Sequence, residues 1–278
     1  MIKMHTPTWK LVFPVFIIIS ILLSCWPVDN QKDQSRFESD QVNSLEFQSE
    51  YINQSYAYSE NDPGAVIEIT YIEITEAPSL EIQDAINEQL EDIMIYSQGF
   101  ESYQQLMDSF ITEYRVYYES NAEDPLNIGW EDQRSVEVIY NRQNIFSVGC
   151  NFYSFTGGAH PNGWTNYYNF DIQTGDIINL QNLFSYREIK KLQSTGESLF
   201  RDMYGIKPDE NYSDYDFWFP QDEFYLNENF FIDDQGLTFY YNSYEIAPYA
   251  SGPTNLHIPY ELIVDLIDQD NILYPIAH

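Results

Sequence analysis

The sequence predicts an α+β fold, with mainly antiparallel sheets, packed helices and two small subdomains. Two segments repeat apolar residues at helical spacing, whereas the chain from about Arg134 onward changes to a period of two. Several period-two segments are joined by short turns that contain Gly, Asn or Asp, which favours antiparallel hairpins. Long helices within a mainly antiparallel set of strands are typical of this class.

The N-terminus has the pattern of a secretion signal. Lys3 and Lys10 accompany a short apolar run that contains no acidic residue. The run is shorter than an ordinary membrane-spanning helix and matches the apolar region of a signal peptide. It ends in LLSC, which resembles the lipobox of bacterial lipoproteins. The resemblance implies that residues 1–24 are removed and that the thiol of Cys25 carries lipid. The alternative is an uncleaved anchor helix with an incidental cysteine.

Lipid at Cys25 predicts an exported protein that is held on a bacterial membrane, at the outer membrane or the cell surface. Each buried methylene contributes about 0.8 kcal/mol, so two or three acyl chains anchor stably. Residues 25–49 are polar and acidic without an apolar period, which predicts a flexible tether. We expect the folded part to begin between Leu45 and Tyr51.

The charge of the chain limits its partners. Residues 1–24 contain two lysines and no acidic residue, so residues 25–278 carry 10 basic and 44 acidic residues, a formal net charge of −34. This charge excludes general nucleic-acid binding, because phosphates are neutralised by Lys and Arg. It also argues against docking on anionic lipid. It favours a cationic partner, or no partner, since charge also keeps an exported domain soluble.

The second cysteine is predicted to be structural. If Cys25 carries lipid, Cys150 is alone, and no disulfide forms within the mature chain. Cys150 lies in an apolar strand pattern, which predicts a small buried hydrophobic side chain. A catalytic thiol needs a partner histidine, and the sequence places none beside it.

The first predicted domain, residues 50–150, combines strands with two helices. A strand is predicted over 65–74, where Val and Ile dominate. Ser79 is expected to cap a helix whose apolar stripe ends at Met94, and a second helix is expected over 103–117. Alternation then predicts a strand over 136–140, a turn over 141–144 and a returning strand over 145–155.

The second predicted domain, residues 151–278, is richer in hairpins. A strand over 164–170 leads into a turn in which Gly175 can adopt positive φ, and 177–180 are expected to resume the strand. The remaining expected elements are a helix over 183–204, an irregular segment over 211–229, a hairpin of 230–232 with 237–241, a strand over 256–258 and a short helix over 260–267.

Two motifs resemble a known pair of extracellular domains. They are YSFTGGAHP at 153–161 with YNFD at 168–171, and GLTFYY at 236–241 with YEIAPYASG at 244–252 and IPY at 258–260. Together they resemble the paired domains outside the membrane in RsiV-type anti-sigma factors. The same pair accompanies the catalytic domain of PdaC-type peptidoglycan deacetylases. The resemblance covers residues 45–267.

The resemblance implies binding rather than catalysis. RsiV-type proteins bind lysozyme, a strongly cationic protein, with this region, but they also use a sigma-binding segment and a spanning helix. This sequence shows a signal and a lipid site instead, so an anti-sigma role is not expected. PdaC-type enzymes carry their chemistry in a separate metal-dependent domain with His and Asp ligands. The histidines here, at 5, 160, 257 and 278, form no His-x-x-x-His pair, so we expect no cofactor, no metal site and no deacetylase activity.

Gly157, Gly158 and His160 are the first candidates for ligand binding. Two glycines after a strand predict a sharp turn with positive φ. The alternative is a loop whose N–H groups and histidine face a ligand. His160 either contacts a ligand or transfers protons, or its nitrogens satisfy backbone groups of the turn. His257 alternates with apolar neighbours and is expected on the opposite face of its strand.

Tyr244, Glu245 and Tyr249, in the loop before the last strand, are the second set of ligand-binding candidates. Glu245 would pair with His160 if the two motifs meet in space. Such a pair serves hydrolysis, but the sequence places no Ser or Cys nucleophile beside it, so no catalytic residue is predicted.

Tyr212, Asp214, Tyr215, Asp216 and Trp218 are the candidates for a partner surface. A calcium loop needs oxygen ligands at alternating spacing and a glycine for its turn, and this segment has no glycine. The segment is therefore either a solvated loop with aromatic anchors or an acidic, aromatic surface for a cationic protein.

These patterns predict a membrane-anchored envelope lipoprotein that acts as a non-catalytic binding or sensing module. Its expected partner is lysozyme or another cationic protein, or peptidoglycan. Two alternatives stay open. One is an enzyme that acts on cell-wall glycan through His160 and Glu245, and the other is a structural envelope lipoprotein without a soluble ligand.

Overall fold

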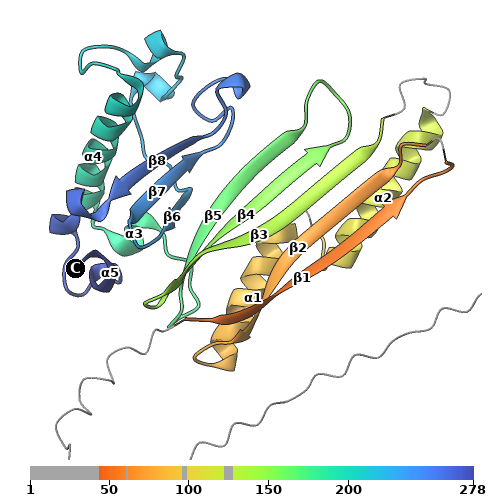
Figure 1. Cartoon of the computed structure of the whole chain (residues 1–278), viewed down its shortest axis with the longest axis horizontal. Helices are drawn as coiled ribbons and strands as arrows, with labels where there is room; N and C mark the ends of the chain where they lie inside the picture. The colour runs from red at the N-terminus through yellow and green to blue at the C-terminus, as the bar shows by residue number, and fades with distance from the viewer. Residues whose placement is uncertain (1–43, 61, 96–98, 122–127) are drawn as a thin grey trace, which may run out of the picture. The chain divides into compact units, whose positions relative to one another are not determined.

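The computed structural model describes residues 44–60, 62–95, 99–121 and 128–278, so the predicted signal peptide and Cys25 lie outside the described residues. Within the described part, the strands form a five-stranded mixed sheet and a three-stranded antiparallel sheet, both accompanied by helices (Figure 1). This confirms the predicted α+β class. Over the same residues, no helix combines the length and the apolar character needed to cross a membrane.

The five-stranded sheet follows the order of the chain, β1-β2-β3-β4-β5. Its strands are β1 (Glu46–Tyr56), β2 (Ala65–Glu76), β3 (Trp130–Arg142), β4 (Ile145–Phe155) and β5 (Asn162–Asp171). β2 and β3 are parallel, whereas the other neighbours are antiparallel. The parallel pair follows from connectivity, because two helices lie between β2 and β3 and provide the long crossover that parallel strands need.

Those two helices, α1 (Leu80–Ile95) and α2 (Tyr103–Ser120), cover one face of the sheet (Figure 1). Ile67 and Ile69 of β2 are buried in the core that includes the apolar side of α1. Since side chains alternate along a strand, Glu68 and Thr70 lie on the opposite face. The face without helices is therefore polar, and it is where a groove described below is found.

The first strand was not predicted, and it changes one expected boundary. β1 begins at Glu46, so residues 46–49 belong to the sheet and not to the predicted tether. The tether residues before 44 lie outside the described part. β1 is an edge strand whose side chains are mostly exposed. A strand that buries so few side chains carries no strong apolar alternation, which explains why the pattern resembles a solvated segment.

The C-terminal lobe is built on the three-stranded sheet. It contains α3 (Leu180–Leu183), α4 (Tyr186–Tyr204), β6 (Phe230–Ile232), β7 (Gly236–Tyr241), β8 (Thr254–Pro259) and α5 (Tyr274–Ala277). Ser185 and Glu188 form a reciprocal capping box at the start of α4, and Gly205 ends it in the left-handed conformation. α4 packs on β8, where a Cβ at Gly196 would lie 3.3 Å from the side chain of Ile258 and 2.9 Å from that of Leu226.

Three boundaries in this half differ from expectation. The expected division at residue 150 falls inside β4, because β4 and β5 complete the first sheet. Residues 177–180 do not resume a strand beyond a single bridge between Phe170 and Ile177, since Asn179 caps α3 and starts a helical turn. Residues 260–267 form two 3₁₀ turns, η4 (Tyr260–Leu262) and η5 (Val264–Leu266), in place of one helix.

Asparagine side chains connect β5 to the C-terminal lobe. The Asn169 amide donates to the carbonyl of Phe230 at 2.9 Å and accepts from the N–H of Ile232 at 2.9 Å. Farther along β5, the N–H of Tyr167 donates to Oδ1 of Asn229 at 2.7 Å. These bonds hold the C-terminal lobe against the outer strand of the first sheet.

Candidate functional site

The two sequence motifs meet in space. His160 lies in the loop between β4 and β5, after Gly157 and Gly158, which both have positive φ. Its ring stacks on Tyr249, with ring centroids 4.4 Å apart and an interplanar angle of 15°. Its Nε2 lies 3.2 Å from the hydroxyl of Tyr244. The first motif and the loop of the second motif therefore form one aromatic cluster.

The hydrogen-bond partners of His160 define its role. Nδ1 lies 2.9 Å from the carbonyl oxygen of Pro161. A carbonyl only accepts, so Nδ1 carries the proton, and Nε2 accepts from the Tyr244 hydroxyl. Both ring nitrogens thus hold the two loops in place: Nδ1 bonds a backbone group of the turn, and Nε2 bonds a side chain of the second loop.

Glu245 stabilises its own turn instead of pairing with His160. Its Oε2 accepts from the N–H of Asn242 at 2.9 Å, and its Oε1 accepts from the side-chain amide of Asn227 at 2.8 Å. Tyr244, inside this turn, has a φ of 71°. Because the turn occupies both carboxylate oxygens, the His–Glu pair considered from the sequence is not assembled.

Trp218 links the acidic aromatic segment to this turn. Its indole Nε1 donates to the carbonyl of Glu245 at 3.1 Å, and its own N–H donates to the carbonyl of Ile246 at 3.0 Å. The Trp218 ring is exposed. The predicted partner-surface residues and the predicted ligand-binding residues therefore share one continuous surface.

Most of the predicted partner-surface residues are exposed, as a surface requires. Asp214, Asp216 and Tyr215 are exposed, and the Tyr215 hydroxyl donates to Glu210. Hydrogen bonds, first from Lys207 and then from Tyr215, lower the pKa of Glu210 to about 2. This carboxylate therefore stays charged over the whole neutral and mildly acidic range.

Tyr212 is the exception, because it belongs to the core. It is 1% exposed, and its hydroxyl donates to Glu197 at 2.8 Å. The Arg201 guanidinium lies 4.2 Å from the centre of its ring, and Phe200 packs edge-on against it. Both contacts come from α4, so the segment carries no local pattern that distinguishes Tyr212 from its exposed neighbours.

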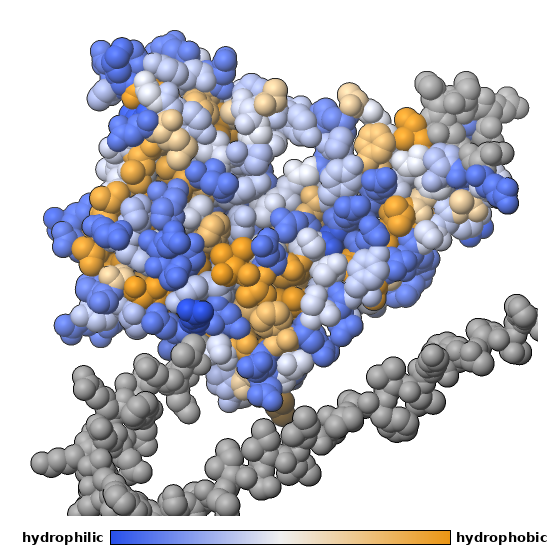
Figure 2. Space-filling model, viewed as in Figure 1, coloured by the Kyte–Doolittle hydropathy of each residue, from blue (hydrophilic) through white to orange (hydrophobic). Residues whose placement is uncertain are grey.

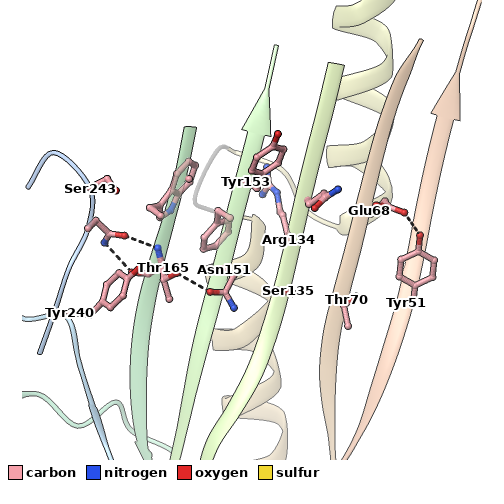
Figure 3. A pocket seen from close by; sticks show the side chains of 15 residues that line it. Tyr51, Glu68, Thr70, Arg134, Ser135, Asn151, Tyr153, Thr165, Tyr240 and Ser243 are labelled. Atoms are coloured by element: carbon pink, nitrogen blue, oxygen red, sulfur yellow. Dashed lines mark hydrogen bonds between the residues drawn. The ribbon is translucent and has the colours of Figure 1, made fainter. Parts of the chain in front are cut away.

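A groove of about 420 Å³ crosses the helix-free face of the first sheet and ends against the segment that follows β7 (Figure 3). Sequence reasoning missed this groove, since its lining comes from six strands, β1 to β5 and β7, and from the loop that follows β7. Figure 2 shows the surface hollowed between the C-terminal lobe and the tip of the β4–β5 hairpin. The aromatic cluster around His160 connects the β4–β5 loop to the loop that follows β7.

The wall of the groove is locked by hydrogen bonds (Figure 3). The N–H of Thr165 donates to Oδ1 of Asn242 at 2.8 Å, and Nδ2 of Asn242 donates back to the carbonyl of Thr165 at 3.0 Å. The Thr165 hydroxyl donates to Oδ1 of Asn151 at 2.8 Å. On the opposite side, the Tyr51 hydroxyl donates to Glu68 at 2.5 Å.

The remaining chemistry-bearing residues are structural. Cys150 is buried and free, and burial raises the pKa of its thiol to about 12, as expected for a buried hydrophobic side chain. His257 is half-buried between two buried strand residues and its Nδ1 bonds to the Thr238 hydroxyl at 2.9 Å. Among the residues that the structure covers, no three His, Cys, Asp or Glu side chains gather as a metal site would require.

Two family models match the chain. Residues 58–163 match the model described as deacetylase PdaC, and residues 181–261 match the model described as a protein of unknown function, DUF3298. No curated protein sequence matches the chain.

Two solved structures have a similar fold. A DUF3298 family member from Bacteroides fragilis NCTC 9343 has a TM-score of 0.73 and 23% identity, and the alignment covers 85% of this chain and 99% of that one. A DUF3298 family protein from Pseudomonas aeruginosa PAO1 has a TM-score of 0.61 and 14% identity, with 81% and 95% covered. At these identities the likeness is one of fold.

Proposed function

We propose that this chain, which carries a PdaC domain followed by a DUF3298 domain, is a lipid-anchored envelope protein that binds a cationic protein without catalysing a reaction. The anchor is Cys25. The observation that carries the proposal is the hydrogen bond between Trp218 and the carbonyl of Glu245. It joins the exposed rings of Tyr215 and Trp218 to those of Tyr244 and Tyr249 in one surface.

Exposed aromatic rings supply the anchors of this surface. Tyr244 is 55% exposed, Trp218 47%, Tyr249 39% and Tyr215 37%. Rings of Tyr and Trp carry much of the binding energy in protein interfaces, because they bury a large area and lose little conformational entropy. The His160 stack and the Trp218 hydrogen bond hold several of them in fixed positions before a partner arrives.

The negative charge of the chain favours a positively charged partner. Asp214 and Asp216 lie exposed beside these rings, and the chain after residue 24 has a formal net charge of −34. Hydrophilic side chains are spread over the face seen in Figure 2, with apolar areas between them. Such a field attracts cationic proteins and raises their association rate. Lysozyme is the cationic protein that the family resemblance implies.

The arrangement of His160 and Glu245 supports a binding role over catalysis. The imidazole bridges Pro161 and Tyr244, and the carboxylate is used by Asn227 and Asn242. Neither group is free to activate a water molecule. For catalysis through His160 and Glu245, the hydrogen bonds of the imidazole and those of the carboxylate would both have to break.

Calorimetry tests the proposal. Residues 30–278 are titrated with hen lysozyme at low and at moderate salt, and saturable binding that persists at moderate salt is expected. Trp218→Ala should weaken the binding at least about tenfold, the size of a hot-spot residue. Tyr186→Ala, which removes an exposed ring at the far end of α4, is the matched control and should leave the affinity unchanged.

Two results would reject capture of lysozyme. One is the absence of binding, or attraction that disappears at moderate salt, because long-range charge alone behaves in this way. The other is equal weakening by Trp218→Ala and Tyr186→Ala, since this would show that the Trp218 surface is not the contact.

A further inference from the structure

We propose that the groove on the helix-free face of the five-stranded sheet binds a neutral carbohydrate chain. The groove is about 420 Å³ in volume, within the range of about 300–1,000 Å³ that is usual for small-molecule sites. Its lining shares no residue with the surface around Trp218, and it does not depend on the capture of a cationic protein.

The groove differs from the rest of the molecule in charge. A fifth of all residues in the chain are charged, yet Glu68 and Arg134 are the charged members among the 15 residues that line the groove. The Arg134 charge is compensated internally, because Arg134 bonds to Asp132 at 2.8 Å and to the carbonyl of Met94 at 2.6 Å. Glu68 accepts a hydrogen bond from the neutral Tyr51 hydroxyl and keeps its negative charge.

With one carboxylate in its lining, the groove lacks the dense negative charge with which the outer surface attracts a cationic partner. An anionic ligand would lose its hydration in the groove without meeting an unpaired cation, and a cationic ligand would meet Glu68 alone. A neutral ligand has a smaller desolvation cost. The site therefore fits an uncharged polar molecule.

The lining also offers hydrogen bonds that the fold does not use. Within the described residues, several hydroxyl and amide groups of the lining make no hydrogen bond to protein: those of Thr70, Gln133, Ser135, Tyr153, Tyr240 and Ser243. Asn151 accepts a hydrogen bond from Thr165 through Oδ1, which leaves its Nδ2 as a further donor in the groove. Such groups both donate and accept, as a dense row of sugar hydroxyls requires.

Aromatic faces complete the match. Tyr51, Tyr153 and Tyr240 lie along the groove from three different strands (Figure 3). A pyranose ring presents C–H groups on its faces and hydroxyls around its edge, so it packs on an aromatic ring while its hydroxyls reach polar groups.

The groove is ordered before a ligand arrives. Asn242 bonds to both main-chain groups of Thr165 and its own N–H bonds to Glu245, so the C-terminal wall is fixed to β5. Thr165 in turn fixes the amide of Asn151. Preorganised polar groups lower the entropic cost of binding.

The experiment uses the full-length protein in detergent and a panel of neutral oligosaccharides: short oligomers of glucose, of xylose and of N-acetylglucosamine. Saturable binding of at least one member is expected by calorimetry, and it should change less than about twofold when salt rises, since no ion pair forms. Ser135→Phe places a ring in the groove and should weaken this binding at least about tenfold.

Glu137→Phe is the matched control. It adds the same ring two residues along β3, on the same face but outside the groove, and should leave the affinity unchanged. Tyr153→Ala is a second test if Ser135→Phe fails to fold, which thermal unfolding by circular dichroism reveals, and it should also weaken binding at least about tenfold.

Three outcomes would overturn the proposal. The first is no saturable binding to any member of the panel. The second is binding that Tyr153→Ala leaves unchanged, or that Ser135→Phe and Glu137→Phe weaken equally. The third is tighter binding of a neutral hydrophilic peptide, built from Gly, Ser and Thr, at the same groove, which would assign the site to polypeptide.

Discussion

The side-chain amide of Asn242 pairs with both main-chain groups of Thr165, at 2.8 and 3.0 Å, as a neighbouring strand would. Asn169 and Asn229 bond to other main-chain groups along the junction of β5 with the C-terminal lobe. The outer edge of β5 is thus closed by asparagine side chains: Asn242 and Asn229 come from the lobe, and Asn169 belongs to β5 itself. An open edge invites pairing with other chains, so this arrangement joins the lobes and protects the strand together.

The junction predicts a large effect of one buried amide. Asn169→Ala should lower the free energy of unfolding by about 2–4 kcal/mol, because it leaves the N–H of Ile232 and the carbonyl of Phe230 buried without partners. Urea unfolding near neutral pH measures the change. Asn166→Ala, on the same strand, is the control and should stay within about 0.5 kcal/mol. Equal effects of the two substitutions would contradict the role given to Asn169.

Local pattern was enough to predict most elements of the first sheet. Ile67 and Ile69 alternate with polar residues, and the apolar stripe of α1 has helical spacing, so β2 and α1 form where the sequence indicates. β1 was missed because an edge strand buries little. Residues 177–180 were wrongly predicted as a strand. Asn179 caps a helix there, but one capping residue is a weaker sequence signal than the neighbouring run of Ile and Leu.

The site was harder to predict, since it depends on long-range contacts. The sequence could name His160 and Tyr249, but it could not show that their rings stack. It placed Tyr212 on the surface, whereas α4 buries it. The groove has no sequence signature at all, because residues as far apart as Tyr51 and Ser243 line it.

Buried tyrosines predict a loss of stability at alkaline pH. Burial is the main cause that raises the pKa of Tyr114, Tyr241 and Tyr260 above the ordinary value of 10.0. Above about pH 10 the unfolded chain therefore loses phenolic protons that the native protein keeps, so the free energy of unfolding falls as the pH rises. The urea midpoint should decrease steadily above this pH, and the share of tyrosinate absorbance that the buried tyrosines contribute should appear only as the protein unfolds.

A midpoint that is constant above about pH 10 would contradict this prediction, since it would mean that native and unfolded tyrosines ionise alike. Tyr241→Phe removes one of these buried hydroxyls and should reduce the pH dependence.

The buried thiol predicts a lack of reactivity. Burial raises the pKa of Cys150 to about 12, so almost no thiolate exists near about pH 8, and the sulfur is also shielded from reagents. With Cys25 replaced by Ser, the native protein should not react with a disulfide reagent such as DTNB. The same protein in denaturant should release one equivalent of chromophore, and rapid stoichiometric reaction of the native protein would exclude a buried thiol.

Anchoring is tested by comparing the two cysteines. If lipid is attached at Cys25, Cys25→Ser should abolish labelling by radioactive palmitate in a bacterial host and should move the protein out of the membrane fraction. Cys150→Ala removes the other thiol, which is buried in the folded part, so this control should keep both the label and the membrane association. Label that survives Cys25→Ser would reject the lipid site. Loss of label with continued membrane association would instead favour an uncleaved anchor helix, because an apolar helix holds the protein without any acyl chain.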